Sequence, residues 1–431
     1  MKFRKVRFSD VVVGDEGLLK GPFGSDLKKS LYVPKGPSTY KVYLQENILK
    51  QNLSKGGHYI TKDYFENSMS RYEVKEGDFI VTCDGTLGEI FQLKGLTESG
   101  IISSSLLRIT LNTNVIDQIY FPYLWRCRIK YPLIRSHENS VLKHLPGLNA
   151  IRNFEFEIPE LLVQESISNV LSALDSKISL NNRINAELEA MAKTIYDYWF
   201  VQFDFPNERG KPYKSSGGKM VWNEELKREI PEGWDSLTLD QMGNIVGGST
   251  PSREVNSYFT TDGIPWITPK DLSLNSGKKF IKKGEIDVTE HGRNSASLNK
   301  LPRGSVLMSS RAPVGYLAIA RKEVTTNQGF KSFVPKGKFT TEYLYYTIKN
   351  LLPVIENNSS GSTFKEVSGA VLKTIYGIAP KDDIVESYTK KVYAIFNRQE
   401  SLEEENHQLA TLRDWLLPML MNGQVTVKNE A

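Results

Sequence analysis

Apolar residues toward the C-terminal end of the chain recur in alternating steps of three and four. The positions that follow this spacing are Val385, Tyr388, Val392, Ile395, Gln399, Leu402, Asn406 and Leu409. A heptad repeat of this kind is typical of a coiled-coil helix, in which single polar residues such as Gln399 and Asn406 commonly set the register. No proline or glycine interrupts residues 385–409. The pattern predicts a long helix over residues 381–423, which would extend for about 60 Å.

A second apolar repeat lies near the middle of the chain and predicts another long helix, over residues 159–203. Its positions are Ile167, Leu171, Leu174 and Ile178, followed after a three-residue slip by Ile184, Leu188, Met191, Ile195 and Tyr198. A slip of this kind locally overwinds a coiled coil. Short helices with such a stripe commonly lie on their own domain. At this length we expect the two helices to pair with each other, antiparallel, because a duplicated chain then acquires a pseudo-two-fold axis.

The segments that precede the two helices look like copies of each other. "GDFIVTCDGTLGEI" at 77–90 and "GSVLMSSRAPVGYLAIA" at 304–320 both predict a strand, a loop and a second strand, with Gly77 matching Gly304 and Gly88 matching Gly315 (304 − 77 = 227). Further on, "SVLK" at 140–143 matches "STFK" at 362–365, and Pro159 matches Pro380 (380 − 159 = 221). A repeat of about half the chain indicates a duplicated domain and not a solenoid.

The predicted fold class is α+β, with two mixed α/β domains separated by an antiparallel coiled coil. The expected segments are a first mixed α/β domain (1–158), the first long helix (159–203), an extended connector (204–233), a second mixed α/β domain (234–380) and the second long helix (381–423). Gly, Pro, Ser and Asn punctuate both domains, as expected for short strands joined by turns.

Length, composition and charge narrow the class of protein. With 431 residues, 39% hydrophobic and 24% charged, the chain is an ordinary globular protein of at least two domains. Its net charge of +5 permits a nucleic-acid partner without requiring one. No apolar run is long enough to cross a membrane, and two cysteines suit a reducing cytoplasm, where we expect the protein to be located.

The sequence has no recognisable set of catalytic or metal-binding residues. It contains neither a glycine-rich phosphate loop nor histidines and cysteines at zinc-ligand spacing. Cys83 is more typical of a small loop residue than of a nucleophile, because no histidine motif accompanies it. Asp63, Glu73 and Lys75 imitate the spacing of a metal-dependent nuclease, but an acidic-x-Lys triplet is common by chance and the second half has no equivalent.

A two-domain protein without catalytic groups and with an internal dyad fits the recognition of double-stranded DNA. Hydroxyl residues beside cations can hold phosphates, while Arg, Lys, Asn and Gln can contact base edges. The candidate DNA-binding residues are Ser25, Lys28, Lys29, Thr82, Asp84 and Thr86 in the first half, and Thr250, Ser252, Arg253, Thr268, Lys270, Ser309, Arg311, Asn327 and Gln328 in the second. The loop tips "TCDGT" and "SSRAP" differ in charge, as expected if each half recognises a different sequence.

Several segments resemble the specificity (S) subunit of type I restriction–modification systems. "GSTPSREVNSYF" with "GIPWITPKDLS" resembles one class of target recognition domain, and "KGPFGSDLKKSLY" with "YKVYLQENI" resembles another. "LSALDSKISLNNRINAELEAMAKTIYDYWF", followed by "FDFPNERGKPYKSSGGKMVW" and "EIPEGW", is similar to the central region of that family. The end of the second helix, "TLRDWLLPMLMNGQVTV", departs from its first-half counterpart "MAKTIYDYWFVQF".

The resemblance implies a non-catalytic subunit that binds a bipartite, gapped DNA target and holds two copies of a DNA methyltransferase subunit. Two copies of a restriction and translocase subunit would complete the complex. S-adenosylmethionine, ATP and magnesium would belong to those partners, and none is expected in this chain. The alternatives are a stand-alone two-domain DNA-binding regulator and a metal-dependent nuclease that uses Glu73 and Lys75.

Overall fold

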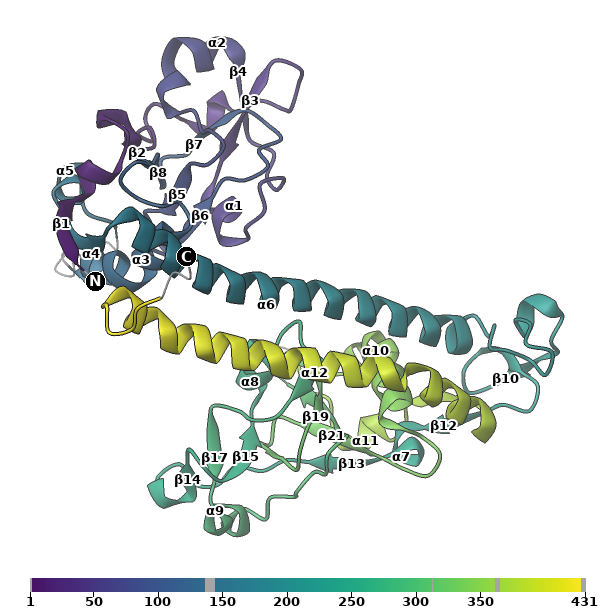
Figure 1. The fold of residues 1–431 in the computed structure, drawn as a ribbon. Helices are drawn as coiled ribbons and strands as arrows, with labels where there is room; N and C mark the ends of the chain where they lie inside the picture. The colour runs from purple at the N-terminus through teal and green to yellow at the C-terminus, as the bar shows by residue number, and fades with distance from the viewer. Residues whose placement is uncertain (1, 136–143, 312, 361–364, 428–431) are drawn as a thin grey trace. The chain divides into compact units, whose positions relative to one another are not determined.

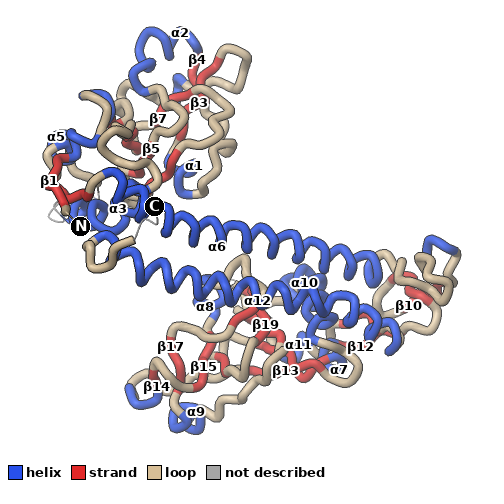
Figure 2. Tube along the Cα trace, in the orientation of Figure 1, coloured by secondary structure: helices blue, strands red, loops and turns tan. Residues whose placement is uncertain are grey.

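The computed structural model describes residues 2–135, 144–311, 313–360 and 365–427 (Figure 1). The chain divides into two compact units, Met1–Lys177 with Leu409–Ala431, and Ile178–Gln408. Each unit contains one mixed α/β domain and part of each of two long helices, α6 (Leu161–Tyr196) and α12 (Asp382–Met421). Figure 2 distinguishes these helices from the short strands of the domains. The predicted fold class is therefore confirmed.

The first unit is built on three small sheets, with strand orders β1-β9, β2-β8-β5-β6 and β4-β3-β7. Its strands are β1 (Phe3–Arg7), β2 (Leu18–Lys20), β3 (Thr39–Tyr43), β4 (Tyr59–Thr61), β5 (Phe79–Thr82), β6 (Ile90–Gln92), β7 (Gly100–Ile102), β8 (Leu106–Ile109) and β9 (Glu155–Pro159). Its shorter helices are α1 (Gln45–Leu49), α2 (Lys62–Tyr64), α3 (Tyr120–Leu124), α4 (Lys130–Arg135) and α5 (Leu148–Arg152). Aromatic side chains, among them Phe8, Phe121 and Trp125, fill its core.

The second unit has sheets with the orders β10-β11, β12-β22, β13-β21-β18-β19-β16 and β14-β17-β15-β20. Its strands are β10 (Met220–Asn223), β11 (Arg228–Pro231), β12 (Asp235–Thr238), β13 (Gly243–Gly247), β14 (Phe259–Thr260), β15 (Ile264–Ile267), β16 (Phe280–Ile281), β17 (Ile286–Val288), β18 (Val306–Ser310), β19 (Val314–Ala320), β20 (Thr325–Thr326), β21 (Lys331–Pro335) and β22 (Tyr376–Ala379). Its shorter helices are α7 (Leu239–Met242), α8 (Pro269–Leu274), α9 (Glu290–Ser295), α10 (Thr341–Asn357) and α11 (Gly369–Leu372).

The duplication seen in the sequence extends to strand pairing. The sheet β2-β8-β5-β6 has the same order as β13-β21-β18-β19, and the parallel pair β3·β7 corresponds to β15·β20. The glycines that open the twin hairpins, Gly77 and Gly304, have positive φ values of 90° and 88°. Such a backbone favours glycine, which explains why this residue recurs at both positions. The matched "SVLK" and "STFK" segments lie almost entirely outside the described residues.

The two long helices pair in opposite directions within each unit. In the second unit, the Asn181 Nδ2 donates to the Asn406 Oδ1 at 3.0 Å, while the Gln399 Nε2 donates to the main-chain oxygen of Asn185 at 3.3 Å. In the first unit, the Arg413 guanidinium pairs with Asp175 at 2.7 Å. The polar positions expected to set the register therefore do bond across the helix pair.

Each helix also packs on its own domain. The apolar stripes therefore serve both purposes considered above, packing on a domain and pairing with the other long helix. In the first unit, Ile167 and Leu171 of α6 enter the core together with Leu420 and Met421 from the end of α12. In the second unit, Val385, Tyr388 and Val392 of α12 share a core with Ala192 and Tyr196 of α6.

Parts of the predicted seam face elsewhere. Met191 is 55% exposed and its neighbour Ala192 is fully buried, because α6 turns a different face toward the core of the second unit. On α12, Phe396 is buried where Ile395 was expected, and Ile395 is only half-buried. Leu174, Ile178, Leu188 and Leu409 are also half-buried, whereas Leu402 is completely buried. The predicted second helix contains one proline, Pro418, close to its C-terminal end.

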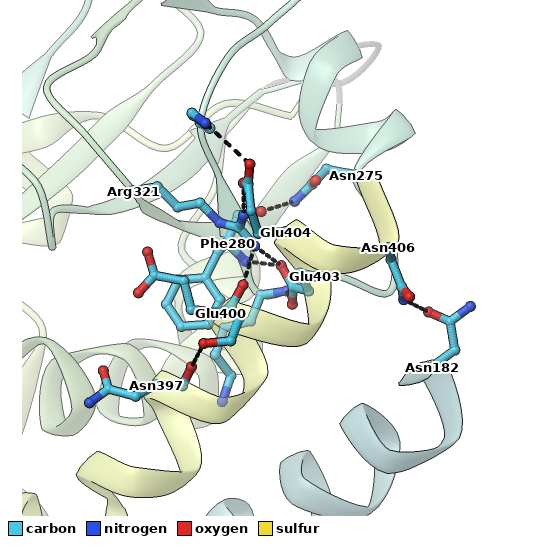
Figure 3. Close-up of polar contacts among 12 residues, drawn as sticks. Asn182, Asn275, Phe280, Arg321, Asn397, Glu400, Glu403, Glu404 and Asn406 are labelled. Carbon is cyan, nitrogen blue, oxygen red and sulfur yellow. Dashed lines mark hydrogen bonds and ion pairs between the residues drawn. The ribbon is translucent and has the colours of Figure 1, made fainter. Parts of the chain in front are cut away.

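A network of charged side chains fixes α12 to the second domain (Figure 3). The Glu403 carboxylate accepts hydrogen bonds from the main-chain amides of Lys279 and Phe280, at 2.8 and 3.1 Å, and pairs with Arg321 at 3.2 Å. Arg321 also pairs with Glu404 at 2.6 Å. Burial raises the pKa of Glu403, and these donors counteract that shift in part.

Lys279 is the most enclosed cation of this network. Its Nζ contacts the carboxylate of Glu189 on α6 at 2.6 Å and the Oε1 of Gln399 on α12 at 2.7 Å, and lies 3.9 Å from the centre of the Phe396 ring. Burial lowers the pKa of Lys279 to about 8, although Glu189 acts in the opposite direction. For Glu189, burial would raise the pKa, but Lys279 and Lys349 outweigh it and lower the value to about 2.

The segment between the halves differs from the extended connector that we predicted. Residues 220–231 form the β10–β11 hairpin, in which the Asn223 side chain accepts hydrogen bonds from the amides of Glu225 and Leu226. Phe205 is buried and stacks on Trp234 at a centroid distance of 4.8 Å. Local turn formation and aromatic burial thus give this polar segment a defined structure. Within the described parts of the chain, no helix combines the length and apolarity that a membrane crossing requires.

Candidate nucleic-acid interface

A buried hydroxyl group closes the twin hairpin in the same way in both units. The Thr82 Oγ1 donates to the Thr86 oxygen at 2.5 Å and accepts from the Glu89 amide at 3.0 Å. The Ser309 Oγ donates to the Pro313 oxygen at 2.8 Å and accepts from the Tyr316 amide at 2.9 Å. Every position in the second set follows its counterpart at the same offset (309 − 82 = 227).

Thr82 and Ser309 therefore belong to the buried frame of each hairpin, by which we mean the strands and the hydrogen bonds that close them. Both side chains are completely buried, and their hydroxyl groups are occupied by main-chain partners. Their position does not favour the predicted contact with DNA, because every residue of β5 and of β18 is buried.

In the first unit, three loops meet the hairpin tip. Gly21 lies so close to the main chain of Ser103 that a Cβ added there would be 2.0 Å from the Ser103 oxygen. The Cys83 amide donates to the Ser105 oxygen at 2.8 Å. The Gln45 Nε2 donates to the Asp84 oxygen at 2.8 Å. The loop after Gly21, which contains Ser25, Lys28 and Lys29, is thereby anchored beside the tip.

The second unit repeats this arrangement. A Cβ at Gly248 would lie 2.1 Å from the Asn327 oxygen, as at Gly21. The Ser310 amide donates to the Gly329 oxygen at 2.8 Å, and the hydroxyl of Thr250 donates to the Gln328 side chain. The structure therefore brings together the predicted residues Thr250, Asn327, Gln328 and Arg311. Their position in the fold corresponds to that of the loops of the first unit.

The other predicted residues fall into two groups. Ser25, Lys28, Lys29, Thr86, Ser252 and Arg253 are exposed on the loops of these clusters. Thr268 caps α8, since its hydroxyl oxygen accepts from the Asp271 amide at 3.4 Å and its own amide donates to the Asp271 carboxylate at 2.8 Å. The exposed Lys270 pairs with Glu285 at 2.5 Å. Thr268 thus has a role in helix capping, which is independent of any ligand.

Sequence reasoning missed four positions at these clusters. Gln45 begins α1 and Ser104 lies in a loop of the first unit, while His144 and Glu366 pair with the two hairpin tips. The drift of the repeat offset along the chain hid these correspondences, because loops of unequal length shift the alignment by a few positions. The matched segments at 140–143 and 362–365 were a signal, since His144 and Glu366 follow them directly.

Comparison with known proteins identifies the family. The type I restriction modification DNA specificity domain matches residues 27–190 and 231–406 of the chain. The chain belongs to the specificity subunits of type I restriction–modification systems. A specificity subunit is the non-catalytic member of its system, so the chain is not an enzyme by itself.

Individual relatives of this specificity subunit differ in how much they share with it. The MjaIX specificity subunit of Methanocaldococcus jannaschii is 42% identical over 163 residues, which is 36% of this chain and 37% of the relative. The HindI specificity subunit of Haemophilus influenzae is 27% identical over 378 residues, 75% of this chain and 81% of the relative. A crystal structure of the type I S subunit from M. genitalium covers 98% of this chain and 96% of its own at 14% identity, with a TM-score of 0.60. That likeness is one of fold.

Each long helix of this specificity subunit has exposed apolar residues near it, and one pair of them lies at equivalent positions. In the second unit, Met191 of α6 is 55% exposed, and Tyr198, which follows the helix, is 38% exposed. On α12, in the first unit, Leu412 and Trp415 are 43% and 55% exposed. Leu412 follows Met191 at the offset of the duplicated helices (412 − 191 = 221). Exposed apolar residues at helical spacing are typical of a protein interface.

No reactive centre is apparent in the described residues of this specificity subunit. Among them, no three His, Cys, Asp or Glu side chains gather as a metal ion would require, and Asp63 and Glu73 form no such group. Burial raises the pKa of Cys83 to about 12, which keeps the sulfur in its unreactive thiol form.

Proposed function

We propose that this specificity subunit binds double-stranded DNA through the two hairpin-tip clusters and recognises a bipartite, gapped target. The observation that carries the proposal is that both clusters share a buried frame and differ in the side chains displayed on it. Lys28, Lys29, Arg253 and Arg311 supply cations for phosphates or base edges, and Asn327 and Gln328 supply amides for base edges. Half-sites about 10 base pairs apart would place both clusters on one face of the duplex.

We further propose that the subunit holds two copies of a DNA methyltransferase subunit and two copies of a restriction and translocase subunit. The equivalent exposed apolar positions Met191 and Leu412 support a partner that binds twice through the same kind of surface. In this scheme S-adenosylmethionine, ATP and magnesium are bound by the partners. Assembly would take place in the cytoplasm, whose reducing conditions suit the free thiols of Cys83 and Cys127.

The DNA proposal is tested by exchanging residues 1–155 for the same region of a specificity subunit with a different target. The exchanged protein is reconstituted with its methyltransferase subunits, and the methylated adenines are located by sequencing. One half of the recognised sequence should change, and the other half and the gap should remain. The reciprocal exchange of residues 234–375 should change the other half. A change in both halves after either exchange would show that the two domains do not recognise DNA independently.

The partner proposal is tested by placing a charge at each of the two equivalent positions. Met191→Asp and Leu412→Asp should each reduce the bound methyltransferase from two copies to one, and the double variant should bind none. The mass of the complex measures this. Tyr393→Asp is the matched control, because Tyr393 of α12 is 58% exposed but has no apolar counterpart at the helix offset, where Ser172 stands (393 − 221 = 172). Undiminished binding by the double variant would contradict the proposed surface.

A further inference from the structure

The two hairpin tips carry ion pairs of opposite orientation at equivalent positions. In the first unit, the carboxylate of Asp84 lies 2.6 Å from the Nδ1 of His144. In the second unit, the guanidinium of Arg311 lies 4.0 Å from the carboxylate of Glu366. Arg311 follows Asp84 at the offset of the hairpins (311 − 84 = 227), and Glu366 follows His144 at nearly the same offset (366 − 144 = 222). An acidic tip with a basic partner therefore corresponds to a basic tip with an acidic partner.

The backbone around the two pairs is the same. Asp84 and His144 form an antiparallel bridge, as do Arg311 and Glu366. The adjacent hydrogen bonds also correspond, since the Leu145 amide donates to the Cys83 oxygen at 3.1 Å and the Val367 amide donates to the Ser310 oxygen at 3.0 Å. The main chain thus places each tip residue and its partner in the same geometry, and only the charges are exchanged.

These ion pairs contribute little to folding. Their four side chains are between 36% and 47% exposed, and pairs with such access to water have small effects on stability. The main-chain bridge already joins the segments without them. A pair whose acidic and basic members are exchanged between the two tips, and which the folded main chain does not require, is available for contact with a ligand.

Three side chains gather closely at Gly329, beside the second hairpin tip. A Cβ added at Gly329 would lie 3.0 Å from the Cγ of Pro269, 3.1 Å from the Oδ1 of Asn327 and 3.6 Å from the Nε of Arg311. Glycine at this position therefore lets the guanidinium of Arg311 and the carboxamide of Asn327 lie close together. In the first unit, the corresponding tip is held from its other side by Gln45, whose side chain bonds to the Asp84 oxygen.

We propose that this tip pair determines one base preference in each domain: Arg311 recognises a guanine and Asp84 recognises a cytosine. The inference rests on the proposed DNA-binding function. Arginine donates two hydrogen bonds to the O6 and N7 of guanine, and a carboxylate accepts one from the N4 amino group of cytosine. Glu366 and His144 are positioning residues, which hold the tip side chains in the orientation that meets the major-groove edge.

The test uses the full chain in complex with its methyltransferase subunits, and sequences the sites that the complex methylates. Arg311→Gln should reduce the preference for guanine at one position of one half-site roughly 10- to 100-fold. Asp84→Asn should do the same for cytosine at one position of the other half-site. Glu366→Gln should weaken the same guanine preference as Arg311→Gln, and Glu366→Asp should restore most of it. His144→Gln should weaken the cytosine preference without affecting the guanine.

Matched controls remove surface ion pairs of the same kind away from the tips. Arg293→Gln breaks the pair with Glu290, which has an N–O distance of 2.7 Å, and Asp15→Asn breaks the pair with Arg152. Neither should alter the recognised sequence. Thermal unfolding of each variant establishes that it is folded.

The outcomes separate this inference from the proposed function. An unchanged target in both Arg311→Gln and Asp84→Asn, with the wild-type complex still selective, would overturn the inference and leave DNA recognition intact. A uniform loss of affinity across all sequences would also overturn it, because that is the effect of a lost phosphate contact. A wild-type complex that methylates no defined sequence would overturn the proposed function itself.

Discussion

The two units use different side chains to attach a long helix to a domain. They use the same hydrogen bonds to close the hairpin. In the first unit, the uncharged side chain of Gln164 on α6 accepts from the Asp117 amide at 2.9 Å and donates to the main-chain oxygens of Val115 and Pro159. In the second unit, the charged side chains around Lys279 and Glu403 perform this task.

The difference shows which contacts can vary after a duplication. A two-strand hairpin offers one position from which a hydroxyl can reach both a carbonyl and an amide, so Thr82 and Ser309 are chemically alike. The junction between a helix and a domain can be satisfied by many combinations of side chains. The side chains of this junction can therefore diverge while the architecture is kept. Four sets of variants test this comparison between the two units.

The largest expected effect comes from removing the buried cation of the second unit. Lys279→Met removes one of the two cations that pair with Glu189 and leaves the Gln399 oxygen without its donor, and should lower the free energy of unfolding by about 3 to 5 kcal/mol. Arg413→Met in the first unit breaks the more exposed pair with Asp175, and should cost about 1 kcal/mol. Urea denaturation of the full chain measures both. Equal losses would indicate that the buried cation and the more exposed ion pair contribute alike to stability.

The next effect concerns the pH dependence of the Glu189 contacts. The pKa of Glu189 is lowered from 4.5 to about 2, so the unfolded chain binds more protons between these values and stability falls as the pH falls through that window. Glu189→Gln should cost about 2 to 3 kcal/mol at neutral pH, and this difference from wild type should shrink between pH 4.5 and 2.

Glu98 in the first unit provides the comparison. Hydrogen bonds from Lys35, Lys41 and Tyr59 lower its pKa to about 2 against the effect of burial. Glu98→Gln should therefore lose its destabilising effect over the same pH window as Glu189→Gln. A difference from wild type that stays constant from neutral pH down to the acid end of that window would contradict the assignment in either unit.

A smaller loss of stability is expected from adding a methyl group at Gly21 or Gly248, which precede the loops beside the two hairpin tips. Gly21→Ala and Gly248→Ala both push a methyl group against a main-chain oxygen, and each should cost about 1 to 3 kcal/mol. Gly24→Ala is the control, because a Cβ there would meet no atom within 4 Å. It should change stability by less than about 0.5 kcal/mol. Melting temperatures of the three variants decide whether the two loops are anchored equally.

The smallest effect is expected at the hairpin hydroxyls. Ser309→Ala and Thr82→Val remove two hydrogen bonds each, and should cost about 1 kcal/mol, whereas Thr82→Ser should be close to wild type. Hydrogen exchange provides a local measurement, since the amides of Tyr316 and Glu89 lose their acceptors. Faster exchange in one unit and not in the other would contradict the equivalence of the two frames.

The sequence predicted where the long helices lie better than it predicted which residues cover their side chains. Heptad spacing identified both long helices, and Gln399 and Asn406 as register positions, because side-chain period follows directly from helix geometry. The same spacing assigned Met191 to the seam, since periodicity reveals an apolar face without revealing what covers it. The burial of Thr82 and Ser309 was missed because hydroxyl residues in a loop motif resemble ligand contacts. His144 and Glu366 could not be placed, because their pairing depends on strands far apart in the chain.

The presence of Leu420 and Met421 in the core of the first unit has a consequence for biosynthesis. The ribosome must release the chain through Met421 before those two side chains can reach Ile167 and Leu171. The core of the first domain therefore cannot be completed when that domain has just been synthesised, unlike the usual order in which earlier domains fold first. A chain that stops before Leu420 would accordingly lack part of the core of the domain that was made first.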